Sequence, residues 1–170
     1  MNHIFLVYMS AFDQDKYDKA KEAAHNYFQK NRKIRSPLLG VVHLNSDGFL
    51  HLVYGDKNHK QKRDWKNQVK RFHLVSYIKR IIEGMGFHQE YMEQYQTVTI
   101  MQHKKKVPAN KLVKYWGFVA VIDNKIRVKL ILRQVGNGNI HFWSVIPFWK
   151  TTYYKDIQVV DLSTGDLDVD

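Results

Sequence analysis

Three cationic side chains alternate along a stretch of this sequence that is otherwise aliphatic. Arg127, Lys129 and Arg133 lie at odd-numbered positions, and the even-numbered positions from 126 to 132 hold Ile, Val, Leu and Leu. A two-residue alternation is typical of a strand with one apolar and one charged face. Cations crowded on one strand repel one another unless an anion binds among them. The pattern therefore predicts a phosphate-binding face, with a solvated basic surface as the alternative.

Histidine and serine side chains accompany these cations. The turn sequence GNGN at 136–139 predicts that the segment IHFWSVIP at 140–147 pairs antiparallel with the cationic strand. This second strand carries His141 and Trp143 on one face and Ser144 on the other. His51 lies in the apolar segment FLHLVY at 49–54, and His73 lies in a basic segment further on. Titratable rings and a hydroxyl are thus available to join the guanidinium groups.

These residue types suit the cleavage of RNA without a metal ion. The reaction needs a base for the 2′-hydroxyl proton, a cation for the phosphorane oxygens and an acid for the leaving 5′-oxygen. Imidazole titrates near pH ~6.5, and guanidinium matches phosphate oxygens. The expected catalytic residues are His51, His141, Arg133 and Ser144, with His73 a third histidine for proton transfer. The expected nucleic-acid contacts are Arg127, Lys129, Arg71, His73, Tyr115 and Trp143.

Each candidate also has a plainer interpretation. His51 would be a core histidine bonded to the backbone, and His141 a surface histidine. Ser144 would satisfy a backbone group. Tyr115 and Trp143 would be core residues, although an exposed ring that stacks on a base contributes ~1–3 kcal/mol to binding. The test is whether a histidine and a cation converge on one phosphate position.

No metal or cofactor is expected. The chain has no cysteine, so it can form neither a disulfide nor a thiolate zinc site. His43, His51 and His59 recur every eight residues, but no HExxH motif and no paired carboxylates accompany them. The sequence also lacks a glycine-rich phosphate loop.

The charge is divided unevenly along the chain. The net charge is +11, yet the last fifteen residues hold five Asp and neither Lys nor Arg, which leaves +16 on residues 1–155. A basic body rich in Tyr, Trp and His favours RNA as the partner, with DNA as the alternative. The apolar run at 4–9 is too short to span a membrane and lacks the features of a secretory signal. We therefore expect a cytoplasmic protein with no membrane partner.

The element pattern predicts an α+β fold. A helix is expected from Asp13 or Asp15 to Lys30, and a helix with a bend near His73 is expected over residues 64–85. A hairpin is expected over 41–44 and 49–54 around the turn 45–48, and strands over 97–101, 112–122, 125–135 and 140–147. Residues 104–108, KKKVP, read as a basic loop.

We therefore expect helices packed on one face of a four-stranded antiparallel sheet, with an extra N-terminal helix and hairpin. The expected divisions are a strand and helix extension at 1–36, an α+β domain at 37–155 and an acidic C-terminal tail at 156–170.

Two segments carry a resemblance to a known family. The helix KRFHLVSYIKRII at 70–82, followed by strands ending in IHFWSVIP at 140–147, resembles the barnase, EndoU, colicin and RelE-like superfamily of metal-independent ribonucleases, in particular its phage- and toxin-associated branches. The resemblance covers about residues 40–150. It implies a toxin or phage-associated endoribonuclease that cleaves RNA by 2′-hydroxyl transesterification on the open sheet face, and an antitoxin or immunity protein as a further partner.

Two points stay open at this stage. No glutamate obviously fills the general-base role that one plays in barnase-like members. The same basic and aromatic sheet would also suit a noncatalytic RNA- or DNA-binding module of a mobile element.

Overall fold

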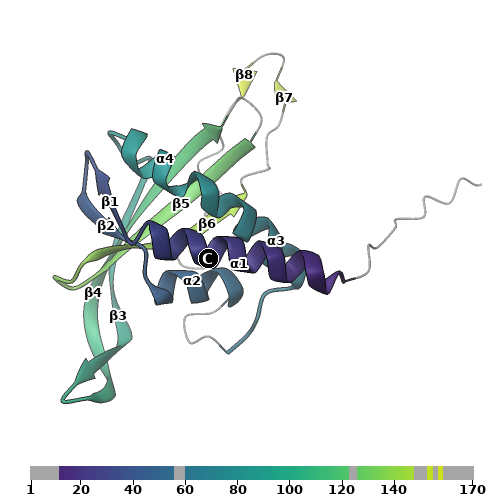
Figure 1. Ribbon diagram of the computed structural model, residues 1–170. Coiled ribbons are helices and arrows are strands. Elements are labelled where there is room, and N and C mark those ends of the chain that lie inside the picture. Colours follow the sequence, from purple (N-terminus) through teal and green to yellow (C-terminus); the bar gives the residue numbers. More distant parts are fainter. Residues whose placement is uncertain (1–11, 56–59, 123–125, 148–152, 155–156, 159–170) are drawn as a thin grey trace, which may run out of the picture.

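A mixed sheet and a layer of helices make up the described chain. The computed structural model describes residues 12–55, 60–122, 126–147, 153–154 and 157–158 (Figure 1). The helical elements are α1 (Gln14–Lys30), α2 (Ser46–Val53), α3 (Trp65–Leu74), the 3-10 turn η1 (Val75–Tyr77) and α4 (Ile78–Gly84). The strands of the main sheet are β1 (Lys33–Ser36), β2 (Gly40–His43), β3 (Glu90–Gln102), β4 (Lys105–Ile122), β5 (Ile126–Val135) and β6 (Ile140–Pro147). A separate ladder pairs β7 (Tyr153–Tyr154) with β8 (Ile157–Gln158).

The strand order β1-β2-β6-β5-β4-β3 confirms the α+β class but corrects its detail. Strands β3 to β6 form the expected antiparallel meander. The four-stranded antiparallel sheet is nevertheless wrong, because the sheet of the described residues has six strands and β2 pairs parallel with β6. Residues 33–36, at the end of the expected N-terminal extension, form β1 and pair with β2. The pairing of β2 with β6 joins segments about a hundred residues apart, so no local pattern in the sequence predicts it.

The helices expected near the N-terminus and at 64–85 are confirmed. The Asp13 side chain accepts a hydrogen bond from the Lys16 amide at 3.1 Å and caps α1. Ala20, Ala24 and Phe28 form the buried stripe of α1. The bend expected near His73 is the passage from α3 through η1 to α4. Figure 1 shows α1, α3 and α4 crossing one face of the sheet.

The expected hairpin around residues 45–48 is wrong, because this segment begins helix α2. The Asn45 side chain accepts a hydrogen bond from the Gly48 amide at 2.9 Å, which is the N-cap geometry of a helix. Leu52 and Val53 are buried in the helix-side core. The short apolar run at 49–54 fits either a strand or a buried helix by its pattern alone.

Helix α2 lies close against β6 because residue 48 is a glycine. A Cβ at Gly48 would meet the Phe142 carbonyl oxygen at 2.3 Å and the Phe142 ring at 2.7 Å. Within the described residues, strand β2 pairs with β6 at two positions, Val42 with Ile140 and His43 with His141. Helix α2 follows β2 in the chain and packs beside β6.

Strands β3 and β4 are longer than expected. The strand expected at 97–101 runs from Glu90 to Gln102, and the basic segment expected to be a loop belongs mostly to β4. The turn itself comprises only His103 and Lys104. Strands β5 and β6 and their antiparallel pairing are confirmed.

The sheet buries apolar residues on both of its faces. Trp116, Phe118, Leu130 and Leu132 belong to the core shared with the helices. Val113, Tyr115, Ile131 and Trp143 form a second cluster, and in β4 and β5 they occupy positions that face away from the first. We call this second side the far face. Apart from 157–158, the acidic tail lies outside the described residues, as does the apolar run at 4–9.

Candidate active site on the far face of the sheet

Five of the residues selected from the sequence meet on the far face. Arg133 of β5 pairs in register with His141 of β6 on one side and with Tyr115 of β4 on the other. Trp143 of β6 and His51 of α2 complete the group, which we call the His–Arg cluster. It draws on four elements, so its residues are distant in the sequence and adjacent in space.

Trp143 is the contact that Arg133, His51 and His141 share. The Arg133 guanidinium carbon lies 4.2 Å from the Trp143 ring centroid, and the His51 ring stacks on Trp143 at 4.1 Å between centroids. The His141 ring meets Trp143 edge-on at 6.3 Å. The pairing of Ile131 with Ser144 and of Leu132 with Phe142 leaves Trp143 as the extra residue of a β-bulge.

His141 has the properties of a base. Burial lowers its pKa from the ordinary value, and the Arg133 charge lowers it further, whereas its contact with the Asn139 carbonyl raises it. Nδ1 lies 3.3 Å from this carbonyl oxygen, which can only accept, so Nδ1 is the protonated nitrogen. Nε2 is buried and has no hydrogen-bond partner in the structure described. The neutral ring therefore holds an unused lone pair on Nε2.

Arg133, which pairs in register with His141 on the neighbouring strand, carries an unused donor. Its side chain is 9% exposed, and its Nε has no hydrogen-bond partner among the described residues. A buried donor without an acceptor costs about 1–3 kcal/mol, so such groups call for an explanation. An oxyanion that accepts from Arg133 beside His141 would supply one.

The other cations of β5 lie outside the cluster. Lys129 is 1% exposed and forms an ion pair with Glu90 of β3, with Nζ 2.7 Å from Oε2. Arg127 is 6% exposed and pairs in register with Val121. The burial of all three cations differs from the open basic face that the alternation suggests, and the anion beside Lys129 belongs to the protein itself.

Glu90 is the charged residue that the sequence analysis missed. Its side chain crosses β4 at Gly117, where a Cβ would lie 3.0 Å from the Glu90 Cβ and 3.2 Å from its Oε2. Gly117 therefore leaves room for the carboxylate to reach Lys129 on β5. The signal in the sequence is weak, because Glu90 lies ahead of the region expected to be a strand. A glycine in the middle of an apolar strand was the available hint of a close approach.

Arg71 and Ser144 are joined to each other. The Arg71 guanidinium donates to Ser144 Oγ at 2.8 Å and to the Val145 carbonyl at 3.2 Å. These bonds tie α3 to β6, which agrees with the structural interpretation of Ser144. His73 is exposed on α3 and belongs to none of the contacts of the cluster. The nucleic-acid roles of Arg71 and His73 stay predictions.

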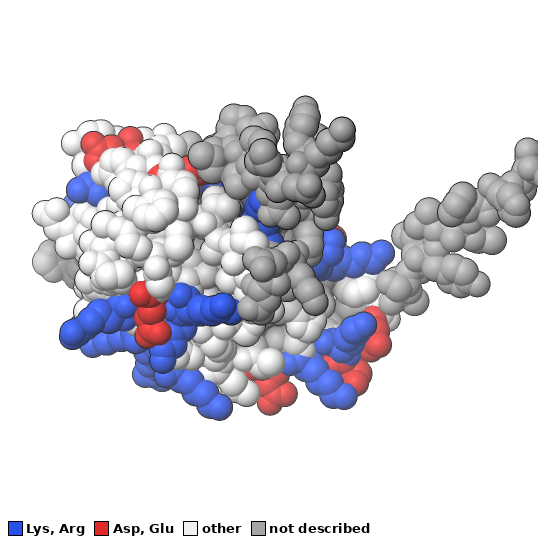
Figure 2. Space-filling model, turned by 90° about the horizontal axis from the view of Figure 1, so that it is seen from above, with Lys and Arg blue, Asp and Glu red and all other residues white. Residues whose placement is uncertain are grey.

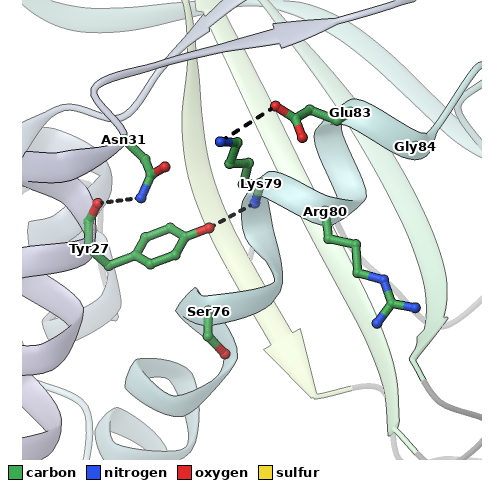
Figure 3. Close-up of a pocket in the computed structure, with 7 residues that line it drawn as sticks. All are labelled: Tyr27, Asn31, Ser76, Lys79, Arg80, Glu83 and Gly84. Atoms are coloured by element: carbon green, nitrogen blue, oxygen red, sulfur yellow. Dashed lines mark hydrogen bonds and ion pairs between the residues drawn. The ribbon is translucent and has the colours of Figure 1, made fainter.

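The helix layer carries the hollow shown in Figure 3. It has a volume of about 560 Å³ and lies between α1 and α4. The Lys79 amide donates to the Tyr27 hydroxyl at 3.1 Å, and Lys79 Nζ lies 3.9 Å from Glu83. Asn31 donates to the Tyr27 carbonyl at 3.0 Å. These groups bind one another and link the two helices, so the hollow offers no arrangement comparable to the His–Arg cluster.

Surface charge on the helix layer is mixed. Figure 2 shows Lys and Arg gathered along the lower edge of the molecule, which is the side that faces the viewer in Figure 1, with Asp and Glu among them. Lys19 of α1, for example, pairs with Asp15 at 2.7 Å. Within the described ranges, no group of three or more His, Asp or Glu side chains could hold a metal ion. No helix there is long and apolar enough to cross a membrane.

Comparison with known proteins found no relative from which a function could be inferred, so the inference of function rests on the geometry of the site. No family model matches the chain, and neither a curated protein nor a solved structure matches it.

Proposed function

We propose that this protein is a metal-independent endoribonuclease that binds the reacting phosphodiester at the His–Arg cluster. The observation that carries the proposal is the pairing of His141 with Arg133. Each is buried, each has a nitrogen without a hydrogen-bond partner in the described structure, and the two occupy paired positions on adjacent strands. A proton acceptor and a phosphate-binding group are the two components that metal-free RNA cleavage needs side by side.

The roles follow from the chemistry of each group. His141 Nε2 takes the proton of the 2′-hydroxyl, and the resulting oxygen attacks the adjacent phosphorus. Arg133 neutralises the phosphorane oxygens. His51 gives a proton to the leaving 5′-oxygen. The bond from phosphorus to the 5′-oxygen breaks, and the products carry a 2′,3′-cyclic phosphate and a 5′-hydroxyl.

The aromatic members of the cluster hold these groups in place. Tyr115 and Trp143 are 0% and 2% exposed, so their rings pack against protein. Arg133 lies over both rings, at 5.8 Å from the Tyr115 centroid. We assign them a positioning role in place of base stacking. Because Arg133 and His141 are each less than a tenth exposed, the far face must open before RNA can bind.

A noncatalytic RNA- or DNA-binding module is the second candidate. Such a module needs a broad exposed strip of cations and aromatic rings. The buried cations of β5 and the compact His–Arg cluster fit an enzyme better. The proposal includes a toxin or phage setting, with the cytoplasm as the location and an antitoxin or immunity protein as the partner that restrains the enzyme.

The test is cleavage of mixed RNA in excess EDTA, with analysis of the new ends. We expect fragments that end in 2′,3′-cyclic phosphate. His141→Ala should reduce the rate by about 10²–10⁴-fold, which is the contribution of a positioned acid or base. His88→Ala is the matched control, because it removes an exposed histidine outside the cluster. RNA that is bound but stays intact would favour the module, and equal loss in both variants would contradict the assigned site.

A further inference from the structure

The hairpin of β3 and β4 extends beyond the rest of the sheet. Strand β4 pairs with β5 only from Val113 onward, so in the strand pairing of the described residues, segment 96–111 pairs only with itself. We call this segment the β3–β4 arm. Six residue steps from Lys111 to Lys105 at about 3.3 Å each give it a length of roughly 20 Å. Figure 1 shows it projecting from the body of the molecule.

The arm carries positive charge that no acidic residue of the arm neutralises. It contains His103 and four lysines, Lys104, Lys105, Lys106 and Lys111, and no Asp or Glu. All five side chains are exposed, and none of the lysines makes an ion pair in the described structure. The lysines of α1 differ, because Asp15, Asp18 and Glu22 lie among them. A projecting, unneutralised row of cations is suited to a polyanion.

The two residues of the turn at the tip adopt a backbone conformation that is unfavourable for residues with a side chain. His103 and Lys104 have φ angles of 48° and 64°, in the left-handed region. Two-residue hairpin turns of this kind favour Asn-Gly, because glycine and asparagine adopt positive φ with less strain. Here a histidine and a lysine occupy both positions. A strained backbone that carries exposed polar side chains points to a role for the side chains themselves.

The arm begins beside the His–Arg cluster. The Tyr115 hydroxyl donates to Gln96 Oε1 at 3.0 Å, and Tyr115 pairs in register with Arg133. Tyr115 therefore links Arg133 to the base of the arm. The tip lies roughly 20 Å further on at about 3.3 Å per residue, which is beyond the reach of a dinucleotide.

We infer that the β3–β4 arm binds the phosphate backbone of RNA that extends to one side of the cleaved bond. This inference rests on the proposed function and adds a substrate class, polymeric RNA rather than short oligonucleotides. The lysines contact phosphates, so the arm supplies affinity without sequence preference.

The first test is a binding measurement that needs no cleavage. The probe is a fluorescent 20-nucleotide 2′-O-methyl RNA, which lacks the attacking hydroxyl. Lys104→Gln/Lys105→Gln/Lys106→Gln should weaken binding at least tenfold at low salt and reduce the log-log salt slope by about 2, at roughly 0.7 per phosphate contact on a single strand. Lys16→Gln/Lys21→Gln/Lys30→Gln is the matched control. These three lysines are exposed on α1, and their substitution removes the same charge as the arm variant does. Equal losses in both variants, or none in either, would overturn the inference.

A second variant separates binding from folding. His103→Asn/Lys104→Gly gives the tip an Asn-Gly turn, so we expect a higher melting temperature together with about threefold weaker RNA binding. Stronger or unchanged binding would contradict a role for the tip side chains. A polyglutamate of matched charge that competes as well as RNA would overturn the assignment to nucleic acid.

Cleavage assays distinguish failure of this inference from failure of the proposed function. The arm variant with three glutamines should keep wild-type kcat/KM on a dinucleotide and lose it on a 20-nucleotide RNA. Suppose that the wild-type protein cleaves neither substrate, and that the arm variant binds RNA more weakly than the wild type while the α1 control does not. This result would refute the ribonuclease activity and retain RNA binding by the arm. Cleavage of both substrates at wild-type rates by the arm variant would refute the arm alone.

Discussion

At the scale of single residues, His141 links the proposed site to the stability of the fold. Its pKa is lowered chiefly by burial, so below the ordinary histidine pKa of about 6.5 the unfolded chain binds a proton that the folded chain excludes. Stability from this group is therefore complete above pH 6.5 and is lost as the pH falls through the folded pKa.

We expect the wild-type free energy of unfolding to fall by up to about 1.4 kcal/mol per pH unit for this one proton, and His141→Gln to lose that part of the dependence. Urea unfolding between pH 4.5 and 7.5 measures it. His73→Gln, at an exposed position, is the control and should retain the wild-type slope. Parallel curves for wild type and His141→Gln would refute the assignment.

The buried ion pair of Lys129 with Glu90 is the second interaction on the far face whose contribution to stability can be tested with single substitutions. Glu90→Gln would leave the ammonium group of Lys129 buried without its carboxylate, and breaking a buried pair costs about 3–5 kcal/mol. We expect a loss near the lower end of this range, because Glu90 is 13% exposed. Glu90→Gln/Lys129→Met removes the stranded charge and should recover part of the loss in a urea titration. A double variant less stable than the single one would contradict this account.

At the scale of elements, the contact of α2 with β6 positions His51. Gly48→Ala would place a Cβ 2.3 Å from the Phe142 carbonyl oxygen, which is backbone and cannot yield without moving the strand or the helix. We expect a loss of about 1–3 kcal/mol from this overpacking, although alanine favours a helix by about 1 kcal/mol over glycine.

Gly84→Ala is the matched control, since Gly84 also lies in a helix and a Cβ there meets nothing within 4 Å. It should be neutral or stabilising in the same urea titration. If Gly48→Ala were equally harmless, α2 would not be held against β6 as described. Loss of RNA cleavage with Gly48→Ala alone would connect this packing to the His–Arg cluster.

At the scale of the whole molecule, the structure divides into a doubly packed sheet and a projecting arm. Strands β5 and β6 carry core residues on both faces, whereas an isolated two-stranded hairpin is marginally stable in water. We expect arm amides at 97–110 to exchange with deuterium much faster than amides of β5, because they open locally without global unfolding. Bound 2′-O-methyl RNA should slow the arm amides selectively. Uniform exchange across β3, β4 and β5 would show that the arm is not a separate unit.

Much of the secondary structure could be predicted from local pattern. Asp13 and the apolar stripe indicate α1, the shift of the stripe near His73 indicates the bend between α3 and α4, and the glycine turn at 136–139 indicates the β5–β6 pairing. These signals arise from neighbours in the chain, through capping, periodicity and turn chemistry. The segment at 49–54 was predicted to be a strand because a short apolar run fits the pattern of a strand as well as that of a buried helix. The signal that distinguishes the two is Asn45, which caps the helix.

The sequence by itself determined the residue types of the candidate site, because only certain side chains transfer protons or bind phosphate at neutral pH. His51, Tyr115, Arg133, His141 and Trp143 could all be selected from their chemistry and their strand patterns. Only the tertiary structure decided that these five meet, that Lys129 is neutralised by Glu90 and that β2 runs parallel to β6. All of these features depend on contacts between segments that are distant in the sequence. They also involve local details of the packing, namely the bulge at Trp143, the close approach of Gly48 to Phe142 and that of Gly117 to Glu90. Burial and register are properties of the packed sheet, so no single strand contains them.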